Sequence, residues 1–151
     1  VRSGAYQRSL RQLDPDIAVT AKACPLFVPL VENGRFRRGD VVIETVAREY
    51  LEPLRREGLD TLILGCTHYP LLTDIIGDIM GPGVTLINTG EEAAWELKRT
   101  LRAMDLLAPE GPAGRATLCA SDQPEHFGSL AAYFLGESLT RPVQPVDIDR
   151  Y

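Results

Sequence analysis

The sequence predicts a parallel α/β fold, in which short apolar strands alternate with amphipathic helices. Two apolar runs of strand length, 61–64 and 84–87, are each followed by residues with helical periodicity. With 151 residues, 44% of them hydrophobic and 25% charged, the chain is long enough for one ordinary domain with a core. Alternating strands and helices favour a parallel sheet, and such sheets collect ligands at the carboxyl ends of their strands.

The first third of the chain is expected to contain a helix, a strand and a loop. Ser3 is a candidate N-cap for a helix that ends near 14–16, and residues 17–20 have the composition of a short strand. Two prolines in the segment 24–32, CPLFVPLVE, argue against a regular helix or a central strand. We therefore expect an apolar loop that ends on Glu32, a carboxylate that suits either a solvated surface or the margin of a site.

Further elements follow from capping residues and apolar periodicity. Asp40 can cap a helix that Pro53 kinks or ends, and Pro70 fits the first position of a helix. The Gly-Pro-Gly sequence at 81–83 stops that second helix, and Thr89 opens a stretch with the spacing of a capping box. The remaining expected elements are a linker, a strand and a helix, at 109–114, 116–120 and 127–135.

The segment 62–72, LILGCTHYPLL, carries the strongest chemical signal in the sequence. An apolar strand stops at a glycine, and a thiol, a hydroxyl and an imidazole follow at Cys66, Thr67 and His68. The adjacent imidazole and the helix N-terminus that follows both favour the thiolate form of Cys66. Because the loop follows a predicted parallel strand, we interpret Cys66 as a reactive thiol in a ligand site, supported by His68.

The other two cysteines are interpreted as buried apolar residues. Cys24 and Cys119 each lie in an apolar run, and a free cysteine is among the most buried residue types. A zinc site formed by Cys66, His68, Cys119 and His126 is an alternative that supplies four ligands. Its spacings match no common zinc module, so the thiol chemistry is favoured.

Composition and charge exclude several function classes. The 16 basic and 21 acidic residues give a net charge of −5, which argues against a nucleic-acid or anionic-membrane partner. No apolar stretch approaches the roughly 20 residues that span a bilayer, and no signal-peptide pattern opens the chain. Three widely spaced cysteines fit a reducing cytoplasm better than a disulfide framework.

Several stretches together resemble the glutamate racemases of the aspartate/glutamate racemase superfamily. The octapeptide at 65–72, GCTHYPLL, is similar to the second cysteine motif of that family. Other stretches agree with the family in order and spacing, namely SGAY at 3–6, CPLFVPLVE at 24–32, SD at 121–122 and FLG at 134–136. The resemblance covers nearly all of the chain.

This resemblance implies racemisation at the Cα atom of glutamate by two opposed cysteines, without a cofactor. It assigns Cys66 as the acid/base that acts on the L-enantiomer, with His68 and Glu32 assisting it. Thr67 is implied to bind the substrate carboxylate, and His68 is implied to contribute to substrate binding. The implied setting is a bacterial cytoplasm that supplies D-glutamate to peptidoglycan, with no metal and no nucleic-acid or membrane partner. A homodimer is left open.

The resemblance also implies that a partner segment lies outside this sequence. Glutamate racemases are longer, with two similar α/β domains facing each other, and the half that holds the first catalytic cysteine has no counterpart here. We expect 1–90 to form one parallel-sheet, three-layer domain of the racemase type, and 91–151 to return to the missing domain. The chain begins with Val1, which fits a fragment. On this view the isolated chain is inactive.

Two other interpretations stay open at the level of sequence. Another superfamily member, such as an aspartate racemase or a one-cysteine decarboxylase, would share parts of these motifs, although the intact segments at 24–32 and 65–72 favour glutamate. A catalytically silent α/β module that binds a partner is the second interpretation, because the first cysteine motif is absent.

Overall fold

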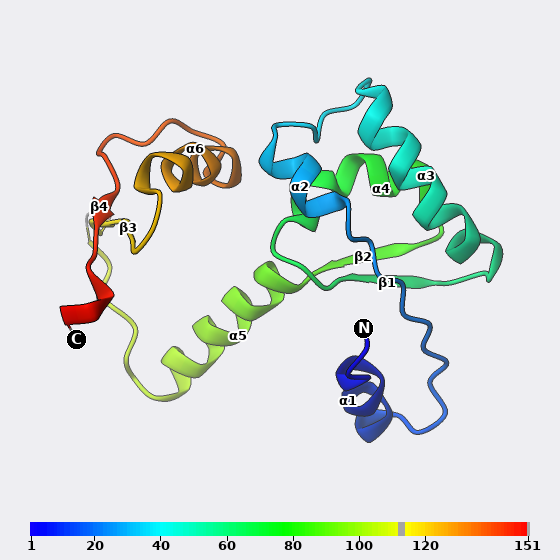
Figure 1. The fold of residues 1–151 in the computed structure, drawn as a ribbon. Coiled ribbons are helices and arrows are strands. Elements are labelled where there is room, and N and C mark those ends of the chain that lie inside the picture. Colours follow the sequence, from blue (N-terminus) through cyan, green and yellow to red (C-terminus); the bar gives the residue numbers. More distant parts are fainter. Residues whose placement is uncertain (112–113, 151) are drawn as a thin grey trace. The chain divides into compact units, whose positions relative to one another are not determined.

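The computed structural model describes residues 1–111 and 114–150, and the chain divides into two compact units (Figure 1). The first unit spans Val1–Ala94 and the second Trp95–Tyr151. Within the described residues, each unit has its own two-stranded parallel sheet accompanied by helices. The predicted α/β class with parallel strands is therefore confirmed.

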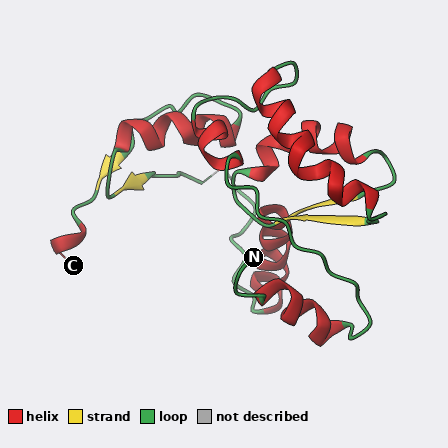
Figure 2. Ribbon diagram, turned by 45° about the vertical axis from the view of Figure 1, so that its right-hand side comes forward, coloured by secondary structure: helices red, strands yellow, loops and turns green. Residues whose placement is uncertain are grey.

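In the first unit, several of the helices lie over one face of a parallel strand pair (Figures 1 and 2). Its elements, in order, are α1 (Ala5–Leu13), α2 (Phe27–Glu32), α3 (Val41–Arg56), β1 (Thr61–Leu64), the 3-10 turn η1 (Tyr69–Leu72), α4 (Thr73–Met80), β2 (Thr85–Asn88) and the start of α5 (Thr89–Ala103). In both views α2, α3 and α4 share one side of the β1–β2 pair. Leu62 pairs with Leu86 in the parallel register, and α4 forms the crossover that parallel strands require.

The core of the first unit lies among α2, α3, η1 and α4. Six apolar side chains there are at most 1% exposed, namely Phe27, Val31, Ile43, Ala47, Leu72 and Ile76. They come from all four of these elements. Burial of this one apolar cluster therefore holds the short α2 against the longer helices.

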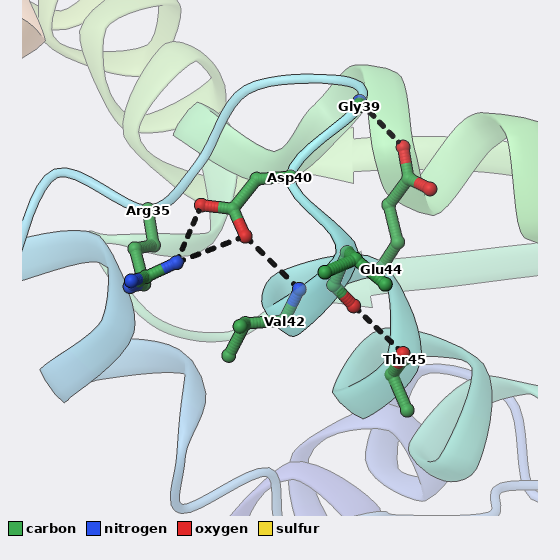
Figure 3. A network of polar contacts seen from close by, with 7 residues as sticks. Arg35, Gly39, Asp40, Val42, Glu44 and Thr45 are labelled. Carbon is green, nitrogen blue, oxygen red and sulfur yellow. Dashed lines mark hydrogen bonds and ion pairs between the residues drawn. The ribbon is translucent and has the colours of Figure 1, made fainter.

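Helix α3 begins where the sequence predicts, at a carboxylate cap (Figure 3). Asp40 accepts a hydrogen bond from the backbone N–H of Val42 at 3.0 Å. Arg35 donates to both oxygens of the same carboxylate, at 3.1 and 3.2 Å. The cap therefore satisfies one of the four N–H groups that a helix leaves unpaired at its start, and it also ties down the preceding loop.

Two prolines lie inside helices, and for Pro29 this differs from the sequence expectation. Pro29 is the third residue of α2, where backbone N–H groups have no intrahelical acceptor, so the segment 24–32 contains a helix instead of the expected loop. Pro53 lies within α3, which continues to Arg56. The carbonyl that Pro53 leaves without a donor belongs to Glu49, which is exposed, so water can satisfy it.

Two N-terminal expectations are also wrong. Residues 17–20 form no strand, because the sheet of the first unit contains only β1 and β2 among the described residues and offers them no neighbour. Thr20 instead donates its hydroxyl to Glu57 at 2.8 Å. The N-cap of α1 is Gly4 and not Ser3, because this position has a φ of 63°, in the left-handed region that favours glycine.

Residues 65–69 form the loop after β1, which we call the cysteine loop. The helix and strand that follow it match the prediction, but the next cap does not. The chain turns through η1 into α4, which ends at Gly81 with a φ of 89°. At the start of α5, Asn88 caps the helix, because its Oδ1 accepts from the backbone N–H groups of the two residues after Thr89, at 3.1 and 3.3 Å. The Thr89 hydroxyl donates instead to the carbonyl of Leu64 at 3.0 Å, so it joins the ends of both strands.

The second unit combines helical segments with very short strands. Besides the rest of α5 it contains β3 (Cys119–Ala120), α6 (Pro124–Leu135), β4 (Gln144–Pro145) and η2 (Ile148–Arg150). Helix α6 ends at Gly136, which has a φ of 70°, as the sequence predicts. The strand expected at 116–120 is reduced to its last two residues, and the linker expected at 109–114 lies partly outside the described residues.

Candidate active site

The cysteine loop lies at the carboxyl end of β1, where a parallel sheet collects ligands. After the strand, the backbone N–H of Gly65 donates to the carbonyl of Ile63 at 3.0 Å. The N–H of Tyr69 then donates to the carbonyl of Cys66 at 3.1 Å, which closes a turn over Cys66, Thr67 and His68. The turn presents the three polar side chains together, beyond the last residue of the strand.

Glu32, His68 and Cys66 lie next to one another in the folded chain. Oε1 of Glu32 is 3.2 Å from Nε2 of His68, and Nδ1 of the same ring is 4.0 Å from the Sγ atom of Cys66. The side chains of His68 and Glu32 are 19% and 37% exposed, so the pair is partly shielded from water. When Nε2 donates its proton to the carboxylate, Nδ1 presents a lone pair toward the thiol. The arrangement can therefore move a proton to and from Cys66.

Thr67 is the most exposed member of the turn. Its hydroxyl oxygen lies 3.3 Å from Nδ1 of His68, the same nitrogen that faces Cys66. The structure thus brings all four residues singled out from the sequence into one cluster, with Glu32 joining from α2. A ligand held by the Thr67 hydroxyl would lie beside both the thiol and the imidazole.

The other cysteines differ from Cys66 in opposite ways. Cys24 is buried, and this burial raises the pKa of its thiol to about 11, with Lys22 opposing the shift. Cys24 therefore stays a neutral thiol at physiological pH. Cys119 is exposed, which corrects the expectation of a buried residue, because β3 has only two residues and pairs with an equally short β4. Cys66 alone of the three lies beside a histidine that faces a carboxylate.

Tyr69 is a residue of the site that the sequence did not single out. Its hydroxyl donates to the backbone carbonyl of Cys24 at 3.3 Å, and its ring lies edge-on to Phe27 with centroids 5.3 Å apart. Burial, followed by Cys24, Cys66 and Tyr50, raises the pKa of Tyr69 to about 12, so the phenol remains a hydrogen-bond donor. Its place directly after His68 was the available signal, but its partners are distant in sequence.

The described residues contain no group of three or more histidines, cysteines, aspartates and glutamates that could hold a metal ion. The zinc alternative has no ligand set there. In the same part of the chain, no helix is long and apolar enough to cross a membrane.

Comparison with known proteins gives a consistent set of relatives, although no protein-family model matches the chain. The chain is 42% identical over 139 residues to the glutamate racemase of Geobacter metallireducens, covering 92% of this chain and 51% of that protein. It is 45% identical over 148 residues to the glutamate racemase of Mycobacterium tuberculosis, covering 96% and 54%. The chain thus spans about half the length of the curated relatives it matches.

Solved structures agree with the sequence relatives. The glutamate racemase of Francisella tularensis in complex with D-glutamate matches with a TM-score of 0.85 and 31% identity, covering 99% of this chain and 55% of that one. The Thermus thermophilus enzyme in complex with β-chloro-D-alanine matches with a TM-score of 0.82 and 45% identity, covering 99% and 54%.

In fold and in sequence, the chain is similar to proteins of the α/β amino-acid racemase class. More particularly, it is a homologue of the glutamate racemases and corresponds to about half of such a protein. The first expectation drawn from GCTHYPLL, a kinship with glutamate racemases, is thereby confirmed.

Proposed function

We propose that the complete protein interconverts L- and D-glutamate without a cofactor and that Cys66 is one of its two acid/base thiols. The observation that carries the proposal is the contact chain from Glu32 through His68 to Cys66, at 3.2 and 4.0 Å. It is supported by relatives named glutamate racemases and by a related structure that holds D-glutamate.

In the proposed reaction, the Cys66 thiolate takes the proton from Cα of L-glutamate, which leaves a carbanion. A thiol on the opposite face then donates its own proton to Cα, so that the configuration is inverted and no atom is lost. In the reverse direction Cys66 is the acid. His68, held by Glu32, accepts or returns the thiol proton between turnovers, and Thr67 binds the substrate carboxylate.

The opposite thiol belongs, in this proposal, to a part of the protein that this sequence does not include. Residues 1–90 form the domain that carries Cys66, and 91–151 pack with the other domain. The exposed apolar side chains of α5, among them Trp95 at 50% and Leu97 at 58%, are consistent with such packing. We further propose a cytoplasmic enzyme that supplies D-glutamate for peptidoglycan, and we leave a homodimer as a prediction for solution measurement.

The test is a circular-dichroism assay of the complete natural protein with each enantiomer of glutamate, and with aspartate for comparison. Conversion of glutamate, its loss in Cys66→Ala and its retention in Cys24→Ala are expected. The 151-residue chain alone is expected to convert neither enantiomer, because it carries one acid/base thiol. Full conversion by the Cys66→Ala protein would remove Cys66 from the reaction, and preference for aspartate would change the substrate.

A further inference from the structure

Tyr69 connects the two segments that build the candidate site. Its backbone N–H closes the turn that carries Cys66 and His68, donating to the Cys66 carbonyl at 3.1 Å. Its side chain reaches the segment that leads into α2, where the hydroxyl donates to the carbonyl of Cys24 at 3.3 Å. The same ring lies edge-on to Phe27, with centroids 5.3 Å apart and planes at 88°. One residue thus contacts both sides of the site.

The segment that Tyr69 contacts is the one that delivers Glu32. Phe27 is the first residue and Glu32 the last of α2, a helix of six residues. Over that length a helix rises only about 7.5 Å, so a shift of its first turn is transmitted to its last residue. Phe27 is 1% exposed, so the ring that Tyr69 contacts is itself held in place by the surrounding core.

Helix α2 has little intrinsic stability of its own. Isolated helices of fewer than about 12 residues are marginal in water, and α2 has no side-chain hydrogen bond at its N-cap. Its position therefore depends on tertiary contacts. Besides the contact between His68 and Glu32, the cysteine loop supplies the two contacts from Tyr69. The distance between Glu32 and His68 is set by where α2 lies against that loop.

We propose that Tyr69 is a positioning residue that holds Glu32 against His68 and thereby sets the proton transfer at Cys66. The proposed action of Tyr69 is through α2. The effect of Tyr69 on racemisation depends on the proposed function. Its effect on the reactivity of the Cys66 thiol does not.

Tyr50 provides a matched control. Its ring, from α3, also lies edge-on to Phe27, with centroids 5.4 Å apart and planes at 71°. Tyr50 therefore supports the same core residue with a similar aromatic contact, but it belongs to no part of the cysteine loop. Replacing Tyr50 removes packing on Phe27 without breaking the link between the loop and α2.

The experiment measures the rate of alkylation of Cys66 by iodoacetamide in the complete protein, by peptide mapping, alongside kcat and KM for glutamate. Tyr69→Phe, which loses one hydrogen bond, is expected to slow alkylation by about 2- to 10-fold, and Tyr69→Leu by more. The matched Tyr50→Phe and Tyr50→Leu proteins should react like the parent. Kcat should fall in the Tyr69 variants while KM changes little.

A double-mutant cycle with Glu32 separates positioning from general stability. If Tyr69 acts through Glu32, the double variant Tyr69→Leu with Glu32→Gln should be alkylated at Cys66 almost as fast as the Glu32→Gln protein. Additive effects, or equal slowing by Tyr50→Leu, would overturn the proposal, because both would mean that the ring only stabilises the core. If the thiol results hold and no racemisation is measured, the proposed function fails and the positioning role stands.

Discussion

Nε2 of His68 lies 3.2 Å from Oε1 of Glu32, although the two residues come from the cysteine loop and from α2. This contact fixes the orientation of the imidazole, and as a result its second nitrogen, Nδ1, faces Cys66. The chemistry of the candidate site therefore depends on a pairing between two elements that are separated in sequence by α3 and β1.

Glu32→Gln tests that pairing. The amide keeps the shape of the side chain but loses the negative charge and is a weaker acceptor for Nε2 of His68, so alkylation of Cys66 should slow by about 3- to 10-fold at neutral pH. The control is Glu52→Gln, which alters an exposed α3 carboxylate that pairs with Arg56 at 3.7 Å. Equal rates for the two variants would remove Glu32 from the site.

The three cysteines should differ in reactivity. Cys66 is expected to react with iodoacetamide far faster than Cys24, because Cys24 is buried and its thiol stays protonated. Cys119 is exposed and is expected to react as an ordinary thiol, which makes it an internal reference. His68→Asn should slow Cys66 and leave Cys119 unchanged. Peptide mapping after limited alkylation measures all three, and label that accumulates first on Cys24 contradicts the assignment.

Stability should fall in alkaline solution through Cys24. Burial raises the pKa of this thiol from its ordinary 9.0 to about 11, so between these values the unfolded chain loses a proton that the folded chain keeps. The contribution of Cys24 to the free energy of unfolding should therefore be constant below pH 9 and then fall by up to about 1.4 kcal/mol per pH unit.

Urea unfolding of the parent and of Cys24→Ala between pH 8 and 10 tests this alkaline loss. The variant should lack the decline in that range. Tyr69, whose pKa is raised from 10.0 to about 12, adds a loss in both proteins at higher pH. Parallel pH profiles would show that Cys24 ionises equally in the folded and unfolded chain.

Gly65→Ala should disturb the cysteine loop by contact with Tyr6. A Cβ atom at Gly65 would lie 3.0 Å from the hydroxyl oxygen of Tyr6 and 3.2 Å from its Cζ, so something must move. Because the Tyr6 side chain is 48% exposed, it can move aside, and we expect a small loss of stability together with slower alkylation of Cys66.

Removing the Tyr6 ring tests whether Gly65→Ala acts through this contact. Tyr6→Ala combined with Gly65→Ala should recover the alkylation rate, whereas Gly83→Ala, with nothing within 4 Å of the added Cβ, should have no effect by itself. Failure of Tyr6→Ala to relieve Gly65→Ala would mean that the glycine is needed for another reason.

Asp40→Ala should destabilise the first unit through the start of α3. Loss of an aspartate cap costs about 1 kcal/mol, and the carboxylate also accepts from Arg35. Arg35→Ala removes only the second contact and should cost less, since the pair is half-exposed. Thermal unfolding of the two variants measures the difference, and equal midpoints would assign the whole effect to the ion pair.

Local chemistry was enough to predict much of this protein from its sequence. The strand at β1, the caps at Asp40, Gly81 and Gly136 and the grouping of Cys66 with His68 depend on neighbouring residues. A cap needs only the next few N–H groups, and a left-handed turn needs only a glycine. Such features survive whatever the rest of the chain does.

The tertiary structure decided the features that depend on burial and on partners. Residues 17–20 lacked a neighbouring strand, Asn88 replaced Thr89 as a cap, and Cys119 stayed exposed on a strand too short to cover it. A helix formed around Pro29 because Phe27 and Val31 could be buried together, and that packing carried Glu32 to His68. The sequence supplied the groups of the candidate site; only packing between distant segments decided that they meet.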